Sequence, residues 1–160
     1  MTDKLTHFDE KGRAQMVDVS AKADTDRHAV ASGRVVFSKS SYEIIRSKGV
    51  KKGDIGKIAE LAGIMGAKRT SDLIPLCHPL PITGVNLEIL PDDEQHAFNV
   101  TVKVKTTGKT GVEMEALTAV MTACLTVYDM AKAVDKSMTI EDVKLLEKSG
   151  GKSDFTREAK

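Results

Sequence analysis

Two residues that could exchange a proton, Asp129 and Lys132, follow an uncharged stretch that runs from residue 116 to residue 128. Residues three apart on a helix occupy neighbouring surface, so these two side chains can act together as general base and general acid. A solvated surface pair fits the same spacing. The spacing alone leaves both interpretations open.

A second candidate is the dipeptide Cys77-His78, which lies between Pro75 and Pro79. Proline fixes its own φ and restricts the residue before it, so we expect a stiff, non-helical connection. A stiff backbone controls the direction of the His78 side chain, which favours a hydrogen-bonding or acid/base role for its imidazole. A solvated loop histidine is the ordinary alternative. Adjacent Cys and His residues do not have metal-ligand spacing, and no metal site is predicted.

Gly108-Lys109-Thr110 resembles the end of a Walker A loop, but Lys103 stands where that loop requires a glycine. The P-loop interpretation is therefore rejected. Gly111 can still free the backbone at a helix N-terminus that attracts an anion, with Lys109 nearby. An ordinary turn and cap is the alternative, and the two stay open.

Further basic residues stand beside glycine, serine or threonine in expected loops. Several of them converging on one place would form a receptor for a polyphosphate. Solvated side chains are the simpler explanation for any single one, and spacing does not show convergence. The residues concerned are Lys52, Lys68, Arg69, Lys148 and Lys152.

Hydrophobic periodicity, β-branched composition and capping residues predict the elements that must position these residues. Strands are expected at 29–37, 85–89, 98–104 and 143–146, with turn residues at 91–95 joining the middle two in an antiparallel hairpin. Helices are expected at 40–48, from 54 to about 66 and from about 112 to 134, and residues 68–75 form a loop or one helical turn.

This order is the split ferredoxin-like pattern. It predicts an α+β fold in which helices pack on one face of a four-stranded antiparallel sheet, with an extra helix in the first crossover. We expect a flexible N-terminal arm at 1–25, a single catalytic domain at 26–150 and a C-terminal tail at 151–160.

The long helix is free of charge on all sides for almost four turns. One stripe holds Glu115, Thr118, Thr122, Thr126 and Asp129, and another holds Leu117, Met121, Cys124, Leu125 and Tyr128. The sheet covers only one side of a helix. A second copy of the chain is therefore expected to cover the other, which predicts a homo-oligomer.

The bulk properties exclude several classes of function. The 160 residues suit one domain, and the net charge of +1 gives no general attraction to nucleic acid or anionic lipid. Cys77 and Cys124 form no CxxC motif or disulfide framework, which favours a reducing compartment and the cytoplasm. We see no signal peptide, and the uncharged stretch is shorter than the roughly 20 residues that span a membrane.

Eight sequence motifs, in this order along the chain, resemble those of the cyclic pyranopterin monophosphate synthase family, also called the molybdenum-cofactor biosynthesis protein C family. The resemblance extends from about residue 16 to residue 154. The segments are 16–22 (MVDVSAK), 52–54 (KGD), 67–70 (AKRT), 72–79 (DLIPLCHP), 107–118 (TGKTGVEMEALT), 128–130 (YDM), 132–134 (KAV) and 148–153 (KSGGKS).

The resemblance implies a ferredoxin-like subunit in a hexamer, a trimer of dimers, with sites at a subunit interface. The implied substrate is (8S)-3′,8-cyclo-7,8-dihydroguanosine 5′-triphosphate, made by a radical S-adenosylmethionine GTP cyclase as the pathway partner. The implied products are cyclic pyranopterin monophosphate and pyrophosphate. No redox cofactor is required, and none is assigned.

The resemblance also implies roles for individual residues. The catalytic positions fall on Asp129, Lys132 and Lys52. The remaining expected positions bind substrate: Leu76, Cys77, His78, Met114 and Glu115 contact it, and Arg27, Lys68, Arg69 and Lys148 match basic positions of the triphosphate or pterin site.

A ferredoxin-like binding module, for RNA or for a small regulatory molecule, is the rival class. RNA recognition on such a sheet usually requires exposed aromatic residues and a basic face. The chain has four Phe, two Tyr and no Trp, and Phe98 is the only aromatic residue in the expected hairpin strands. We therefore favour the enzyme.

Overall fold

The computed structural model describes residues 6–48 and 55–158. Its elements are β1 (Thr25–Val36), α1 (Lys39–Lys48), α2 (Ile55–Lys68), α3 (Thr70–Leu73), β2 (Ile82–Asp92), β3 (Ala97–Gly108), α4 (Glu113–Ala131), β4 (Thr139–Ser149) and β5 (Phe155–Thr156). None of these helices has the length and apolarity that crossing a membrane requires. The predicted division into arm, domain and tail stays a prediction.

The sheet confirms the ferredoxin-like α+β fold. Its strand order is β2-β3-β1-β4-β5, and every pair is antiparallel. The central pair is in continuous register from Thr25 opposite Gly108 to Val36 opposite Ala97. The addition is β5, which pairs with the end of β4 and makes five strands where four were expected. Two residues are too short to produce a periodic signal.

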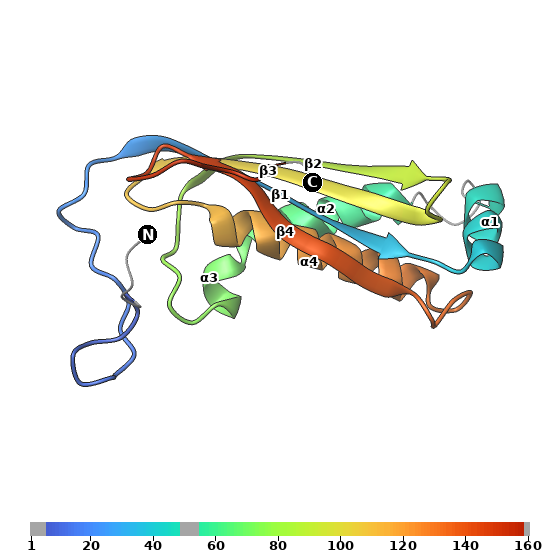
Figure 1. The fold of residues 1–160 in the computed structure, drawn as a ribbon, viewed down its shortest axis with the longest axis horizontal. Coiled ribbons are helices and arrows are strands. Elements are labelled where there is room, and N and C mark those ends of the chain that lie inside the picture. Colours follow the sequence, from blue (N-terminus) through green and yellow to red (C-terminus); the bar gives the residue numbers. More distant parts are fainter. Residues whose placement is uncertain (1–5, 49–54, 159–160) are drawn as a thin grey trace.

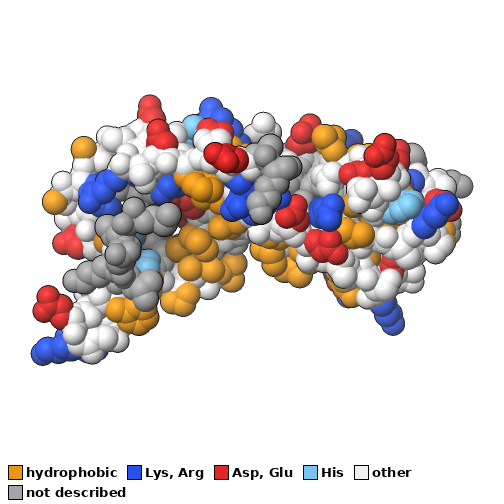
Figure 2. Space-filling model, viewed as in Figure 1, with side chains coloured by type: hydrophobic (Ala, Val, Ile, Leu, Met, Phe, Trp, Pro, Cys, Tyr) orange, Lys and Arg blue, Asp and Glu red, His pale blue; other side chains and the backbone are white. Residues whose placement is uncertain are grey.

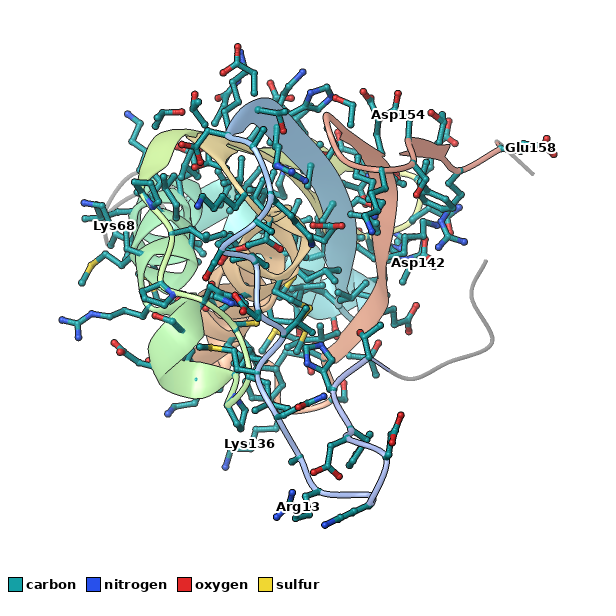
Figure 3. All side chains as sticks on the ribbon, turned by 90° about the vertical axis from the view of Figure 1, so that its left-hand side faces the viewer. Arg13, Lys68, Lys136, Asp142, Asp154 and Glu158 are labelled. Atoms are coloured by element: carbon teal, nitrogen blue, oxygen red, sulfur yellow. The ribbon has the colours of Figure 1, made fainter. Side chains whose placement is uncertain are left out.

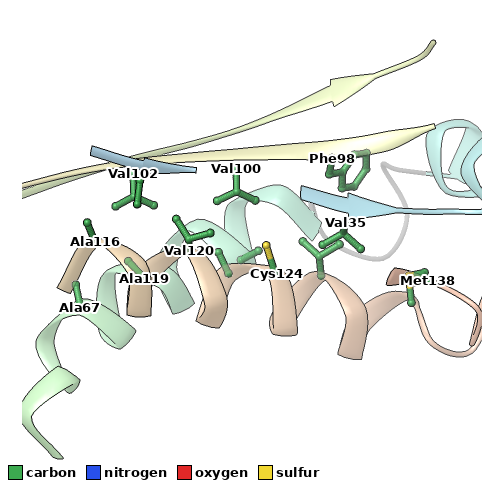
Figure 4. Packing of buried hydrophobic residues seen from close by; sticks show 14 of the residues in the cluster. Val35, Ala67, Phe98, Val100, Val102, Ala116, Ala119, Val120, Cys124 and Met138 are labelled. Atoms are coloured by element: carbon green, nitrogen blue, oxygen red, sulfur yellow. The ribbon is translucent and has the colours of Figure 1, made fainter. Parts of the chain in front are cut away.

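Alternation along the strands builds a core between the sheet and one layer of helices (Figure 1). On β3, Val100, Val102 and Val104 are fully buried, whereas the residues between them are more exposed. They meet Ala116, Val120 and other small or branched residues of α4 (Figure 4). Each buried valine contributes roughly 1.5–3 kcal/mol relative to an exposed one. The helix layer is therefore fixed against the sheet.

Helices α2 and α4 approach each other closely because small residues line their contact. The buried positions of α2 are Ala59, Gly63, Gly66 and Ala67. A Cβ atom on Gly66 would lie 2.7 Å from Thr122 Cβ of α4. The apolar spacing that predicted α2 does not mark this buried face, since its larger apolar side chains, including Ile58 and Met65, are exposed.

Candidate functional site

The sheet has two ends, and α4 carries candidate residues at both. Gly108 lies beside Thr25 at one end, and α4 begins there before it runs back toward the other end. Glu115 and Asp129 are fourteen residues apart, which is about 21 Å along a helix. The candidate residues of one chain therefore form two separate groups.

The first group is the C-end pair, Asp129 and Lys132. The Lys132 Nζ and Asp129 Oδ1 atoms are 2.6 Å apart, and 71% of the Asp129 side chain and 57% of the Lys132 side chain are exposed. The hydrogen bond that Lys132 donates to Asp129 raises the pKa of Lys132, so the amine stays charged in the pair. The contact is short enough for proton exchange, but the pair faces solvent. Lys52, the third expected catalytic residue, lies outside the described residues.

The second group, the N-end cluster, is Arg27, Cys77, Glu113, Glu115 and Lys148. Glu115 is only 4% exposed. Burial raises the pKa of its carboxyl to about 7, and the charge of Glu113 adds to this shift. A carboxyl with such a pKa can donate as well as accept a hydrogen bond near neutral pH. It also acts on Cys77, whose thiol pKa is raised by burial and by Glu115.

Two cations enter the N-end cluster from the strands. Lys148 on β4 places Nζ 2.9 Å from Glu113 Oε1, and Arg27 on β1 donates from Nε to the Gly108 carbonyl at 2.8 Å. A small cavity of about 20 Å³ lies between them. Its lining residues are Arg27, His28, Gly111, Glu113, Lys148, Ser149, Gly151 and Ser153.

The start of α4 is covered by a carboxylate of the chain itself. A Cβ atom on Gly111 would lie 2.7 Å from Glu113 Cδ, so the Glu113 side chain folds back over this glycine. Any phosphate bound here has to compete with Glu113 for Lys148. Lys109 does not join this cluster, because its Nζ donates to the Ser20 carbonyl at 2.9 Å.

The other basic candidates lie at the same end of the sheet but on its β2 side. Lys68 lines an open cavity of about 400 Å³ between α2 and the start of β2, together with Leu80 and Ile82. Figure 3 looks at this end and shows Lys68 on the side away from β4. Arg69 pairs with Asp72 on the surface, with Arg69 Nη1 3.3 Å from Asp72 Oδ2. Neither reaches the small cavity.

The connection between α3 and β2 is non-helical, as its prolines predicted. Leu76, Cys77 and His78 are all half-buried in it, and Met114 is exposed on the first turn of α4. Within the described ranges, no group of three or more His, Cys, Asp or Glu side chains is placed to hold a metal ion.

Two residues at this end of the sheet escaped prediction. His28 contacts Glu147 Oε1 through Nε2 at 2.6 Å and Ser149 Oγ through Nδ1 at 2.8 Å. Glu113 was passed over in favour of Glu115. Both act through partners more than 30 residues away, Ser149 and Lys148, which local spacing cannot reveal.

Fold and site together define a small ferredoxin-like α+β protein with two groups of candidate site residues, one at each end of the helix α4. The MoaC family model matches residues 16–151, so the chain belongs to the MoaC family.

Three relatives, all named cyclic pyranopterin monophosphate synthase, match almost the whole chain. That of Heliobacterium modesticaldum is 60% identical over 151 residues, covering 94% of this chain and 95% of the relative. That of Desulfitobacterium hafniense is 58% identical over 158 residues, covering 97% and 95%. That of Parvibaculum lavamentivorans is 57% identical over 150 residues, covering 94% of each. The resemblance seen in the sequence is confirmed.

Proposed function

We propose that this chain converts (8S)-3′,8-cyclo-7,8-dihydroguanosine 5′-triphosphate into cyclic pyranopterin monophosphate and pyrophosphate. Its family and its relatives make it an enzyme of molybdenum cofactor biosynthesis, a lyase. The observation that carries the proposal is identity of 57–60% along nearly the full length of relatives named for this product. The substrate is proposed to come from a radical S-adenosylmethionine GTP cyclase.

The reaction requires proton transfers while a purine-derived ring opens and re-forms as a pterin. A ribose hydroxyl then displaces pyrophosphate at the α-phosphorus. We assign Asp129 and Lys132 as the general acid and base, in an order that stays open, and Lys52 to the reacting sugar and ring region. The 2.6 Å contact between Lys132 Nζ and Asp129 Oδ1 supports their joint role.

The N-end cluster is proposed to bind the substrate. Glu115 and His78 hold the base edge by hydrogen bonds, and the near-neutral pKa of Glu115 supports this role because its carboxyl can donate one. Leu76, Cys77 and Met114 line the same region. The basic residues Arg27, Lys68, Arg69 and Lys148 are proposed to balance the triphosphate charge and that of the leaving group.

The complete site is proposed to form between copies in a hexamer, a trimer of dimers. The separation of about 21 Å between the two groups on α4 supports this, because one chain alone does not bring them together. An exposed apolar face on the helix layer supports it too (Figure 2). Its members are Ile58, Leu61, Met65, Leu73, Met121 and Leu125. Both cysteines are free thiols, which fits the cytoplasm.

The direct test supplies the cyclised nucleotide to the purified protein. We expect release of pyrophosphate together with a pterin that becomes fluorescent after oxidation. Absence of both products, with a relative from the same family active in parallel, would exclude the proposed reaction. A mobility assay with RNA at moderate salt tests the rival binding module, and no retardation is expected.

A further inference from the structure

His28 is held by a hydrogen bond at each of its two ring nitrogens. Its Nε2 atom lies 2.6 Å from Glu147 Oε1, and its Nδ1 atom lies 2.8 Å from Ser149 Oγ. His28 belongs to β1 and its two partners to β4, where Ser149 stands directly opposite His28 in the register. The proposed mechanism uses neither His28 nor Ser149, although both line the small cavity together with Arg27 and Lys148.

These two contacts decide where the proton of a neutral His28 ring lies. The hydrogen bond with His28 lowers the pKa of Glu147 below its ordinary value of 4.5, so at neutral pH this carboxylate only accepts hydrogen bonds. The ring proton is therefore on Nε2, and Nδ1 is left as an acceptor. Ser149 has to donate its hydroxyl proton to Nδ1. In this state the hydroxyl has no proton to offer an anion.

A second proton on His28 reverses the direction of the hydrogen bond to Ser149. Both nitrogens of the charged ring donate, so Ser149 Oγ becomes the acceptor of the Nδ1–H group. The hydroxyl proton of Ser149 is then free to be donated to another acceptor. Protonation thus adds a positive charge to the wall of the cavity and turns Ser149 into a donor. Both changes favour an anion in the cavity.

Charged side chains surround His28 from β1, β3, β4 and the start of α4. They are Asp26, Arg27, Lys103, Lys105, Glu113, Glu147 and Lys148. Burial also raises the pKa of Glu115 in the N-end cluster to about 7, so this carboxyl gains its proton in the pH range where histidine does. Anion binding is therefore expected to strengthen at lower pH for two reasons. A measurement on the His28 ring itself separates them.

An anion reaches Ser149 only when Glu113 gives up its place. The cavity of about 20 Å³ has room for little more than one water molecule. Glu113 Oε1 lies 2.9 Å from Lys148 Nζ, and the Glu113 side chain is partly exposed, so it can turn toward solvent. A phosphoryl group that replaces this carboxylate then meets Lys148, Arg27 and Ser149 around one space.

We propose that the Ser149 hydroxyl donates a hydrogen bond to a phosphoryl oxygen of the substrate, and that His28 is its positioning residue, which takes up a proton from solvent as the anion binds. This inference rests on the proposed function in one respect, that Arg27 and Lys148 hold the triphosphate. The alternative is a purely structural tie between β1 and β4. The two differ in whether an anion changes the titration of His28.

The test follows the histidine rings of the full-length protein by nuclear magnetic resonance, with sulfate as the probe. Sulfate keeps the same charge throughout the titration of histidine, and chloride at equal ionic strength is the reference. We expect sulfate to raise the titration midpoint of His28 by about half a pH unit or more, because a nearby anion favours the charged ring. His96, whose ring packs against Tyr42 at the other end of the sheet, should keep its midpoint. An unchanged His28 midpoint in saturating sulfate would overturn the proposal.

Variants separate the hydroxyl of Ser149 from the charge of the anion. Ser149→Ala should lose most of the shift that sulfate causes, and Ser149→Thr, which keeps the hydroxyl, should recover it. Ser153→Ala is the matched control, because Ser153 lines the same cavity but forms no hydrogen bond with His28 in the described part of the chain. Equal shifts in Ser149→Ala and the wild type, or an equal loss in Ser153→Ala, would overturn the role of Ser149.

Kinetics then connect this contact to the reaction. With the cyclised nucleotide, Ser149→Ala should raise KM severalfold with little change in kcat, because it removes a binding contact, and Ser149→Thr should recover most of the loss. A normal KM in Ser149→Ala would contradict the contact with the substrate. A wild-type protein that shows the His28 shift in sulfate but no turnover would instead remove the proposed function and leave the anion contact in place.

Discussion

Folding raises the pKa of the Glu115 carboxyl group to near neutral pH. Its pKa is about 7 in the folded chain, against an ordinary value of 4.5, and burial is the main cause. A raised carboxyl pKa means that the folded state binds the proton more tightly than the unfolded state. Stability is therefore fully present below about pH 4.5 and falls as the pH rises toward 7.

The Glu115→Gln variant removes this dependence. Between pH 4.5 and 7 we expect the wild type to lose up to about 3 kcal/mol of unfolding free energy that the variant keeps. Urea unfolding at fixed protein concentration at pH 4.5, 6 and 8 measures the difference. Parallel curves for the two proteins would contradict a buried, near-neutral carboxyl at this position.

Asp129 and Lys132 face solvent, so their removal should not disturb folding. We expect Asp129→Asn and Lys132→Ala to abolish turnover while melting temperature and assembly stay as in the wild type. Exposed substitutions away from packed features usually change stability little. Turnover assays beside calorimetry and light scattering separate the two effects. A near-normal rate in either variant would show that its role is wrongly assigned.

Sequence patterns anticipated some contacts of the candidate site and missed others for a physical reason. The Asp129–Lys132 contact is local, and helical spacing predicted it correctly. The ion pair of Lys148 with Glu113, and the contacts of His28 with Glu147 and Ser149, depend on sheet register. A single sequence does not specify that register residue by residue.

At the scale of elements, the contact between α2 and α4 depends on glycine. A Cβ atom on Gly66 would lie 2.7 Å from Thr122 Cβ, which cannot move without its helix. We expect Gly66→Ala to destabilise the fold by about 1–3 kcal/mol of overpacking, partly offset by the better helix propensity of alanine.

Chemical denaturation measures this cost. Gly84→Ala is the matched control, because a Cβ atom there meets nothing within 4 Å. If both variants were equally stable, the close helix approach would not be a determinant of stability.

The sequence predicted every long element: α1 from its capping residues, β1 from its small and β-branched residues, and the others mainly from the alternation and helical spacing that burial on one face imposes. It did not predict β5, whose two residues carry no pattern. It also did not show which side of α2 is buried, since the contact uses Ala59, Gly63 and Gly66 and leaves Leu61 exposed. Close packing of small residues gives little hydrophobic signal.

At the scale of the whole molecule, the helix layer covers one face of the sheet but exposes its own apolar face. Leu125 on α4 is 55% exposed, and Leu90 on β2 is 52% exposed. If a second copy covers the helix layer, a charge at Leu125 has to be buried on assembly, which is costly.

We therefore expect Leu125→Glu to shift the oligomer to smaller species in light scattering, with an unchanged circular dichroism spectrum. Leu90→Glu, at a similarly exposed apolar position outside the helix layer, should keep the wild-type mass. The same mass for all three proteins would show that the helix layer is not the subunit interface.

A site shared between copies has a further consequence that a site within one chain lacks. Asp129→Asn damages the C-end pair, and Lys148→Ala damages the N-end cluster. When two inactive variants form mixed dimers, one of the two shared sites in each dimer regains all its wild-type residues.

The most direct measurement is turnover of the cyclised nucleotide by Asp129→Asn and Lys148→Ala, unfolded together and reassembled. The substrate concentration is chosen so that neither variant alone is active. We expect the mixture to recover about a quarter of wild-type activity, the share that random pairing gives. Activity no greater than the sum of the separate variants would contradict a site built from two copies.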